Sequence, residues 1–158
     1  MSEIKNINLN LNTKQRFTVD GDANKVIELD THDINVAKRL SESINMMDEL
    51  RDKWNELTEK SAQVVEGKEI TLETNDELTQ LLDELETKMR GIVDFIFDSE
   101  GLCDIILGNS SIFTPVNGKT KYEQIIDGIT GLYEDSIKAE TEKLNKRKIA
   151  NKTAKYVK

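Results

Sequence analysis

The side chains in this chain that could do chemistry are one histidine, one cysteine and a group of carboxylates. His32 stands near Asp30 and Asp33, where an imidazole could act as a metal ligand or a general base. There is no second histidine to complete a usual metal site. We therefore interpret His32 as a polar residue at a junction between a strand and a helix.

Cys103 is the only thiol, so the chain cannot form an internal disulfide framework. A nucleophilic cysteine needs a base and electropositive surroundings, but its near neighbours are Glu100 and Asp104, and His32 is remote in sequence. Leucine and isoleucine flank it on the same short segment. These neighbours predict a buried structural thiol.

Four carboxylates gather in one short stretch of the chain, at Asp94, Asp98, Glu100 and Asp104. They could bind calcium or form an acid–base pair, but they lack the alternating ligand spacing of an EF-hand loop, and helix caps explain them as well. Residues 117–120, Asn-Gly-Lys-Thr, resemble the end of a phosphate-binding loop without its upstream glycine and strand. The sequence therefore predicts no catalytic residue, no metal, no cofactor and no enzyme activity.

Charge is distributed unevenly along the 158 residues. Residues 138–158 hold 8 basic and 2 acidic side chains, a net charge of +6, while residues 1–137 hold 14 basic and 28 acidic ones, a net charge of −14. A body this acidic repels nucleic acid and anionic membranes and attracts a basic partner, its own tail or that of a neighbour. No run reaches the ~18 apolar residues of a membrane span. We expect neither a nucleic acid nor a membrane as a partner.

The first thirty residues have the alternation of β-strands. Ile7, Leu9 and Leu11 alternate with asparagines, and residues 20–22, Asp-Gly-Asp, form a turn signal between two apolar stretches. We expect two or three antiparallel strands within about residues 4–30. Because an isolated hairpin is marginally stable, its apolar face needs the helices or another chain.

Apolar residues at spacings of three and four then predict helices at about 33–64, 75–98, 101–107 and 120–150. Thr74 with Glu77, and Thr120 with Glu123, have the spacing of capping boxes. The second helix has the most apolar face in the chain. We expect that face to form the core.

These elements predict a mainly α (α+β) fold, a bundle of three to four helices with a small N-terminal antiparallel hairpin. Residues 1–137 are expected to form a single α-rich domain, and residues 138–158 a basic tail that is helical or frayed. About 30 residues of the first helix would span about 45 Å, longer than a small domain is wide. Its far half, around Trp54 and Leu57, would then offer apolar surface to another chain.

Residues 94–108 read Asp-Phe-Ile-Phe-Asp-Ser-Glu-Gly-Leu-Cys-Asp-Ile-Ile-Leu-Gly. This resembles small proteins of tailed phages and prophages of Gram-positive bacteria, in which an aspartate-aromatic helix end leads through a glycine into a short helix and a closing glycine. The lysine- and tyrosine-rich end (residues 146–148 and 155–156) and residues 29–34, Leu-Asp-Thr-His-Asp-Ile, resemble the same family. The likeness extends over residues 25–158.

The resemblance implies a tail assembly chaperone, which coats the apolar helices of the tape measure protein until the tail tube polymerises. It implies no catalytic residue, a place in the host cytoplasm, and the tape measure or other tail proteins as partners. The alternative is a structural subunit of the virion, a tail or neck component, whose strands at 4–30 pair with neighbouring copies in a homo-oligomer.

The residues expected to contact a partner are of two kinds, apolar and basic. They are Trp54, Leu57, Ile112, Phe113, Lys146, Arg147, Lys148, Lys152 and Lys155.

Overall fold

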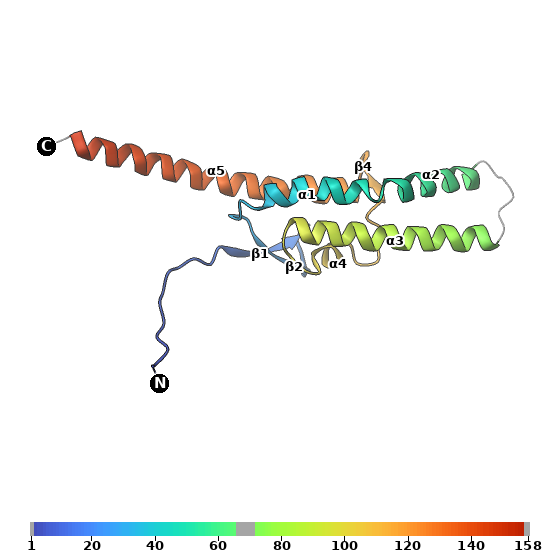
Figure 1. The fold of residues 1–158 in the computed structure, drawn as a ribbon, viewed down its shortest axis with the longest axis horizontal. Coiled ribbons are helices and arrows are strands. Elements are labelled where there is room, and N and C mark those ends of the chain that lie inside the picture. Colours follow the sequence, from blue (N-terminus) through green and yellow to red (C-terminus); the bar gives the residue numbers. More distant parts are fainter. Residues whose placement is uncertain (1, 66–71, 157–158) are drawn as a thin grey trace.

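The computed structural model describes residues 2–65 and 72–156, with the side chains at 61, 63–65, 72–75 and 151–156 outside that description. In chain order its elements are β1 (Lys14–Val19), β2 (Asp22–Asp30), α1 (Val36–Asp48), α2 (Arg51–Val65), α3 (Leu72–Ile96), α4 (Leu102–Leu107), β3 (Pro115–Val116), β4 (Lys119–Thr120) and α5 (Lys121–Tyr156) (Figure 1). The predicted fold class is confirmed: the protein is mainly helical with a small antiparallel N-terminal hairpin.

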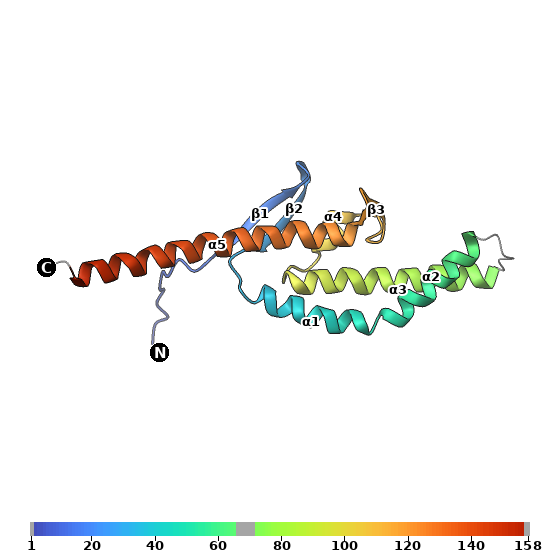
Figure 2. The same ribbon diagram turned by 90° about the horizontal axis from the view of Figure 1, so that it is seen from above.

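In Figure 1, α5 lies level with α1 and above α3, α4 and the β1–β2 hairpin. Seen from above in Figure 2, the hairpin lies on one side of α5, and α1 and α3 lie on the other. The helix α3 runs along α1 and α2 and also contacts α4, which in turn contacts β2. The far half of α5 and the N-terminal residues both extend away from this body (Figure 1).

The β1–β2 hairpin turns at Asp20 and Gly21, whose φ angles are 53° and 74°. Positive φ at both central residues is typical of a two-residue type I′ turn, and glycine adopts it without a steric cost. The predicted turn is therefore confirmed. Phe17 is half-buried while Ile27 and Leu29 are buried, so one face of the hairpin joins the core.

The two strands lie within the predicted range of residues 4–30, but the alternating residues at 7–11 are not part of a strand, because β1 begins at Lys14. Lys14 pairs with Asp30, the last residue of β2, and the chain then turns toward α1. In the described part of the chain, no strand lies opposite the residues before Lys14.

The predicted continuous helix at 33–64 is two helices, α1 and α2, with a break at Glu49 and Leu50. The Leu50 amide donates to the Met47 carbonyl (2.9 Å), a contact three residues back that tightens the turn, and Leu50 is buried. The turn redirects the chain so that Leu50 reaches the core. No glycine or proline stands at this point, which is why the sequence pattern did not indicate a break.

The core is built on the apolar face of α3, as predicted. On α3, Leu85, Val93 and Ile96 are almost completely buried, and so is Phe97 directly after the helix. The ring of Tyr133, on α5, lies 5.7 Å from that of Phe97, and the Tyr133 hydroxyl donates to the Phe97 carbonyl (3.3 Å). Burial raises the pKa of Tyr133 to about 12, so the phenol remains a neutral donor.

Of the two predicted capping boxes, the one formed by Thr120 and Glu123 is confirmed for the Thr120 hydroxyl. The Thr120 hydroxyl accepts the Glu123 amide (3.2 Å), and α5 begins between them. The other prediction is wrong, because α3 begins at Leu72 and Thr74 therefore lies inside the helix, with its side chain outside the described residues. Within the described ranges, no helix has the length and apolar character needed to cross a membrane.

Candidate partner-binding site

An open groove of about 350 Å³ lies where the α1–α2 break, α3, the loop before β3 and the start of α5 meet. We call it the Trp54 groove. Its apolar lining is Met47, Leu50, Trp54, Leu85, Met89, Phe113 and Tyr122, and its polar lining is Asp48, Arg51, Thr120 and Glu123.

Two of the predicted partner-binding residues meet in this groove. The ring of Trp54, on α2, lies 5.0 Å from that of Phe113, with 41° between the ring planes. The Trp54 side chain keeps 42% of its surface exposed, and Phe113 is half-buried. Leu57 and Ile112 are instead buried in the core of the same chain. The accessible surface at this place is therefore that of the two aromatic rings.

Methionines and a tyrosine complete the groove wall. The Tyr122 hydroxyl donates to the Met47 sulfur (3.5 Å), and burial raises the pKa of Tyr122. Met89 lies partly buried on α3. Flexible, polarisable thioethers adapt to differently shaped apolar groups better than branched side chains do. At the rim, Arg51 pairs with Asp48 (2.6 Å), so this edge is polar.

The loop that carries Phe113 is fixed by a carboxylate on α3. Glu86 accepts the Ile112 backbone amide (2.8 Å) and the Ser111 hydroxyl (2.8 Å). Its carboxylate also accepts the Nε of Arg90, one turn along α3 (2.9 Å). Both side chains are largely buried, with 18% and 16% of their surface exposed. Glu86 therefore sets the position of the residue directly before Phe113.

Arg90 binds the preceding part of the same loop. Its Nη2 donates to the carbonyls of Gly108 (3.1 Å) and Ser110 (2.8 Å), and its Nη1 pairs with Asp104 (2.8 Å). Burial opposes the charge on Arg90, but the hydrogen bonds to Asp104 and Glu86 raise its pKa above the ordinary value. One guanidinium thus joins α3, α4 and the loop.

The side chains considered for catalysis occupy structural positions. The His32 backbone amide donates to Asp30 (3.2 Å) at the junction between β2 and α1. Cys103 is fully buried, and burial raises the pKa of its thiol to about 12. Asp94 accepts the amides of Gly101 (3.1 Å) and Cys103 (2.9 Å) at the start of α4, and burial raises its pKa. Among the described residues, no three His, Cys, Asp or Glu side chains are placed to hold a metal ion.

The predicted basic contacts lie on α5, away from the Trp54 groove. Lys146, Arg147 and Lys148 are exposed, and so is every residue from 141 to 150. Lys152 and Lys155 lie on the same helix, with side chains outside the described residues. The structure therefore separates the aromatic part of the predicted set from its basic part.

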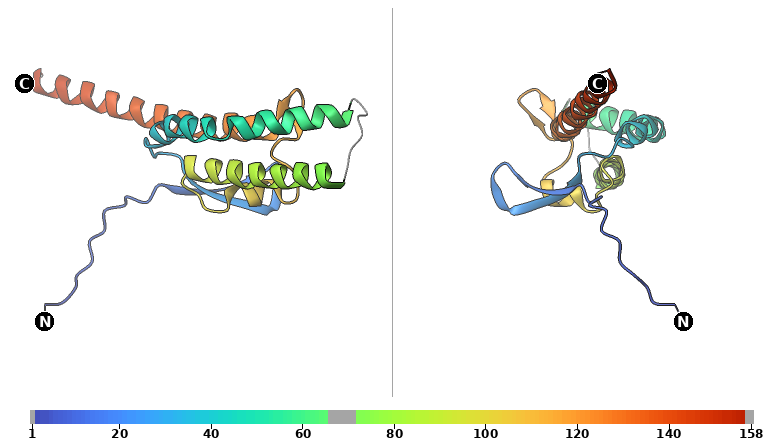
Figure 3. Two further views of the ribbon diagram at one scale, coloured as in Figure 1. Left: turned by 45° about the vertical axis from the view of Figure 1, so that its right-hand side comes forward. Right: turned by 90° about the vertical axis from the view of Figure 1, so that its left-hand side faces the viewer.

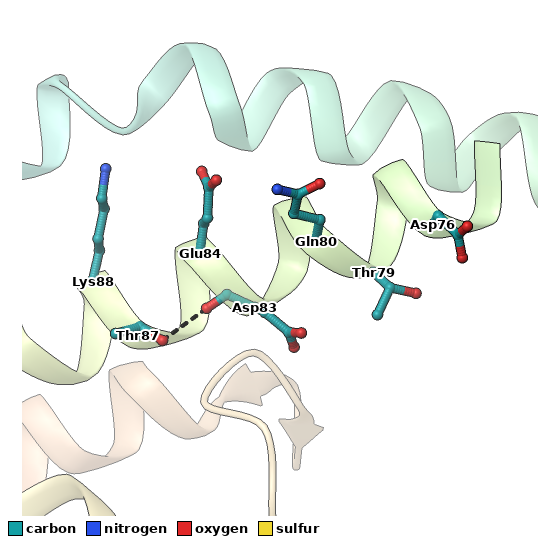
Figure 4. A pocket seen from close by; sticks show the side chains of 7 residues that line it. All are labelled: Asp76, Thr79, Gln80, Asp83, Glu84, Thr87 and Lys88. Atoms are coloured by element: carbon teal, nitrogen blue, oxygen red, sulfur yellow. Dashed lines mark hydrogen bonds between the residues drawn. The ribbon is translucent and has the colours of Figure 1, made fainter. Parts of the chain in front are cut away.

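A larger hollow of about 520 Å³ runs along α3 and is lined by seven of its residues (Figure 4). Gln80, Glu84 and Lys88 point toward α2, whereas Asp83 points to the other side of the helix (Figure 4). The hydrogen bond from Lys53 on α2 (2.8 Å) lowers the pKa of Glu84. Because these side chains converge on no common point, the hollow is a solvated helix face rather than a binding site.

The sequence reading missed the small β3–β4 hairpin. Asn117 and Gly118 have φ angles of 54° and 81°, and the pair between Val116 and Lys119 closes a two-residue turn. An Asn-Gly pair is a strong hairpin signal, but the flanking strands are too short to show alternation. Gln124 donates to the Val116 carbonyl (2.6 Å) and ties this hairpin to α5. Met47, Met89 and Tyr122 were also missed as groove residues, since their spacing indicates only helix faces.

No protein-family model matches the chain, and neither the curated proteins nor the solved structures compared with it gave a match.

Proposed function

We propose that this is a non-enzymatic binding protein that takes an apolar helix face of a partner polypeptide into the Trp54 groove. The observation that carries the proposal is the partly exposed Trp54 ring against Phe113, in a groove that buried leucines and two methionines also line. Tryptophan is enriched among the residues that dominate binding energy, and methionine-lined grooves accept varied apolar helices.

The size of the groove fits a few side chains rather than a whole helix. A volume of about 350 Å³ is at the low end of the range for small ligand sites. An amphipathic helix presents its apolar residues at i, i+3, i+4 and i+7, so one or two turns would fill this space. The polar rim at Asp48, Arg51 and Glu123 would meet the polar flank of the same helix.

Charge narrows the class of partner. Residues 1–137 carry a net charge of −14, so the body favours a basic or neutral segment over an acidic one. The exposed lysines of α5 have the opposite charge and lie away from the groove. A partner that contacts both regions would carry an apolar helix and, separately, acidic residues.

Taken with the resemblance to tail assembly chaperones, these features support a specific role. We propose that the partner is the tape measure protein of a tailed phage or prophage, and that binding in the host cytoplasm shields its apolar helices until the tail assembles. A long helical protein with repeated apolar faces is the kind of partner the groove fits.

A second candidate is a structural subunit of the virion. The exposed, extended N-terminal residues favour it, because they carry apolar side chains with no contact partner in β2. Finding the protein in purified particles would support this role, and its absence from them would support the chaperone role.

Co-expression with the tape measure protein tests the proposal. We expect that protein to become soluble and to co-purify, and Trp54→Ala to weaken binding by about 30-fold or more, the effect of losing an interface hot spot of about 2 kcal/mol. Ile105→Ala is the matched control, since Ile105 is also exposed (40%) but lines no part of the groove. Equal binding by both variants, or a tape measure protein that stays insoluble, would contradict the proposal.

A further inference from the structure

The N-terminal arm, residues 2–12, is a stretch of exposed chain with an unusual apolar content. It leaves the start of β1 and extends away from the body (Figures 1 and 3). Ile4, Ile7, Leu9 and Leu11 are between 62% and 99% exposed. Asn10 has a φ of 54°, so the arm is not extended throughout, but once Asn10 adopts a strand conformation Ile7, Leu9 and Leu11 share one face and the intervening asparagines share the other. This is the pattern of a strand with one face to bury.

The outer edge of β2 contacts other elements of the chain, whereas the outer edge of β1 has no strand beside it in the described residues. On the outer side of β2, the Ser99 hydroxyl donates to the Glu28 carbonyl (3.0 Å), and Lys25 donates to the Ile106 carbonyl (3.0 Å). Among the described residues, no backbone hydrogen bond joins β1 to any element other than β2. The outer edge of β1 can therefore accept another strand.

A second groove, of about 710 Å³, lies over a face of the hairpin formed by both strands, between the hairpin, α4, β3 and α5. We call it the hairpin groove. Phe17 and Val19 of β1 line it, together with Ile27, Ile106, Ile129 and Leu132. Phe17 and Val19 are the half-buried positions of β1, whereas Arg16 and Thr18 are exposed, Thr18 at the margin of the groove. A strand added to β1 would place alternate side chains over this groove.

We propose that the arm of one copy of this chain adds to β1 of a second copy as a third strand, with its apolar face over the hairpin groove. In an antiparallel register, Ile7 lies beside Val19, Leu9 beside Phe17 and Leu11 beside Gln15. All three apolar arm residues then share the face that β1 turns toward the groove.

The contacts made where the arm joins β1 favour a second copy, rather than the same chain, as the partner of the arm. The Thr13 hydroxyl donates to Asp30 (2.6 Å), and Lys14 pairs with Asp30 at the end of β2. If the arm folded back on its own β1 in that register, residues 12–14 would form the turn, and Lys14 would leave its pairing with Asp30. A register shifted by one residue would pair Leu11 with Lys14 and turn the apolar side chains to the opposite face, and a shift of two residues would take Leu11 into the turn. An arm from another copy keeps every one of these contacts.

This inference is independent of the helix-binding proposal, because the Trp54 groove and the hairpin groove share no lining residue. Arm variants should therefore change self-association and leave capture of the tape measure protein unaffected. The Trp54→Ala variant should weaken capture of the tape measure protein and leave self-association unaffected.

The first test is the mass of the full chain in solution as a function of concentration, by light scattering and sedimentation. We expect association, and we expect Leu9→Asp to weaken it by about tenfold or more, since it removes a buried leucine. Asn8→Asp adds the same charge on the other face of the arm and should have no such effect. A monomer at every concentration, or an equal effect of both variants, would overturn the proposal.

The second test asks which chain the arm binds. Chains carrying Leu11→Cys are mixed with chains carrying Gln15→Cys under mild oxidation, and the products are identified by mass. We expect a mixed disulfide, and much less of it when Asn8→Cys replaces Leu11→Cys. The absence of a mixed disulfide would overturn the proposal. If a chain that carries both Leu11→Cys and Gln15→Cys forms an internal disulfide while the mixture forms none, the arm docks within its own chain.

Discussion

Trp54 and Phe113 belong to different segments, α2 and the loop after α4, and their rings lie 5.0 Å apart at 41°. Neither segment determines this contact alone. Glu86 on α3 holds the amide of the residue before Phe113, and the break at Leu50 sets the direction of α2. The Trp54 groove is therefore a product of packing between four segments.

The ring contact itself can be measured by a double-mutant cycle on stability. We expect Trp54→Ala and Phe113→Ala to interact by about 0.5–1.5 kcal/mol beyond the sum of their separate effects, because tilted aromatic pairs contribute that much. Urea unfolding of the parent, both single variants and the double variant gives the value. Strict additivity would mean that the rings do not stabilise each other.

Glu86→Gln should loosen the loop that carries Phe113. The amide keeps the shape of the side chain but loses the charge that pairs with Arg90, so we expect about 1–3 kcal/mol less stability. Trp54 fluorescence should change at the same time, since Phe113 is no longer held against it. The measurements are urea unfolding and the emission spectrum of the folded protein.

Glu84→Gln is the control, on the exposed face of the same helix. It should leave both the unfolding curve and the emission spectrum unchanged, because exposed ion pairs contribute little to stability. If Glu84→Gln and Glu86→Gln behave alike, Glu86 has no special role in the loop.

Stability should depend on the ionisation of Asp33. Burial alone would raise the pKa of Asp33, but its hydrogen bonds with Arg39 (2.8 Å) and the Asn35 amide (3.0 Å) hold it below 3.8. A depressed pKa means that the stabilisation is complete above the pKa of the unfolded chain and is lost as the pH falls through the folded pKa.

The Asp33→Asn variant tests this directly. At pH 7 it should be less stable than the parent by about 0.5–1 kcal/mol, and the difference should shrink below about pH 4. Urea unfolding at a series of pH values measures it. A difference that grows on acidification would contradict the assignment.

The Cys103 thiol should be unreactive in the folded protein. Full burial raises its pKa to about 12, so almost no thiolate is present at pH 8, and reagents cannot reach the sulfur. A chromogenic disulfide reagent should react only as fast as the chain opens, and at once in urea. A cysteine introduced at Asn8 should react immediately under native conditions. Fast modification of Cys103 would show that α4 detaches readily.

The sequence predicted the elements that depend on local signals. The apolar face of α3, the Asp20–Gly21 turn and the Thr120 cap all follow from neighbours in the chain, and all three are confirmed. The alternation at residues 7–11 forms no strand in this structure, and the predicted helix at 33–64 is broken, for one shared reason. Each depends on what lies opposite in space, which is a missing β2 partner in one case and the core that receives Leu50 in the other.

The candidate site was predicted in part. Trp54 and Phe113 were both predicted to contact a partner, which stays a prediction, and the structure places their rings against each other. Leu57 and Ile112 have the same residue class but point inward, since apolar character alone does not distinguish a core residue from a surface anchor. The role of Glu86 was not predictable, because its partners come from a distant loop.

The helix α5 is continuous over 36 residues, from its packed start through its basic end. At about 1.5 Å per residue it is a rod about 54 Å long, with no joint between the buried Tyr133 and the exposed lysines. A molecule bound to the exposed lysines of α5 would therefore be held at a fixed distance and a fixed rotation from the body. Inserting one residue between the two halves would swing every lysine by about 100°, whereas inserting seven would nearly restore the original direction and lengthen the lever. The number of residues in α5 thus sets the distance and the angle between a molecule bound to its lysines and one bound to the body.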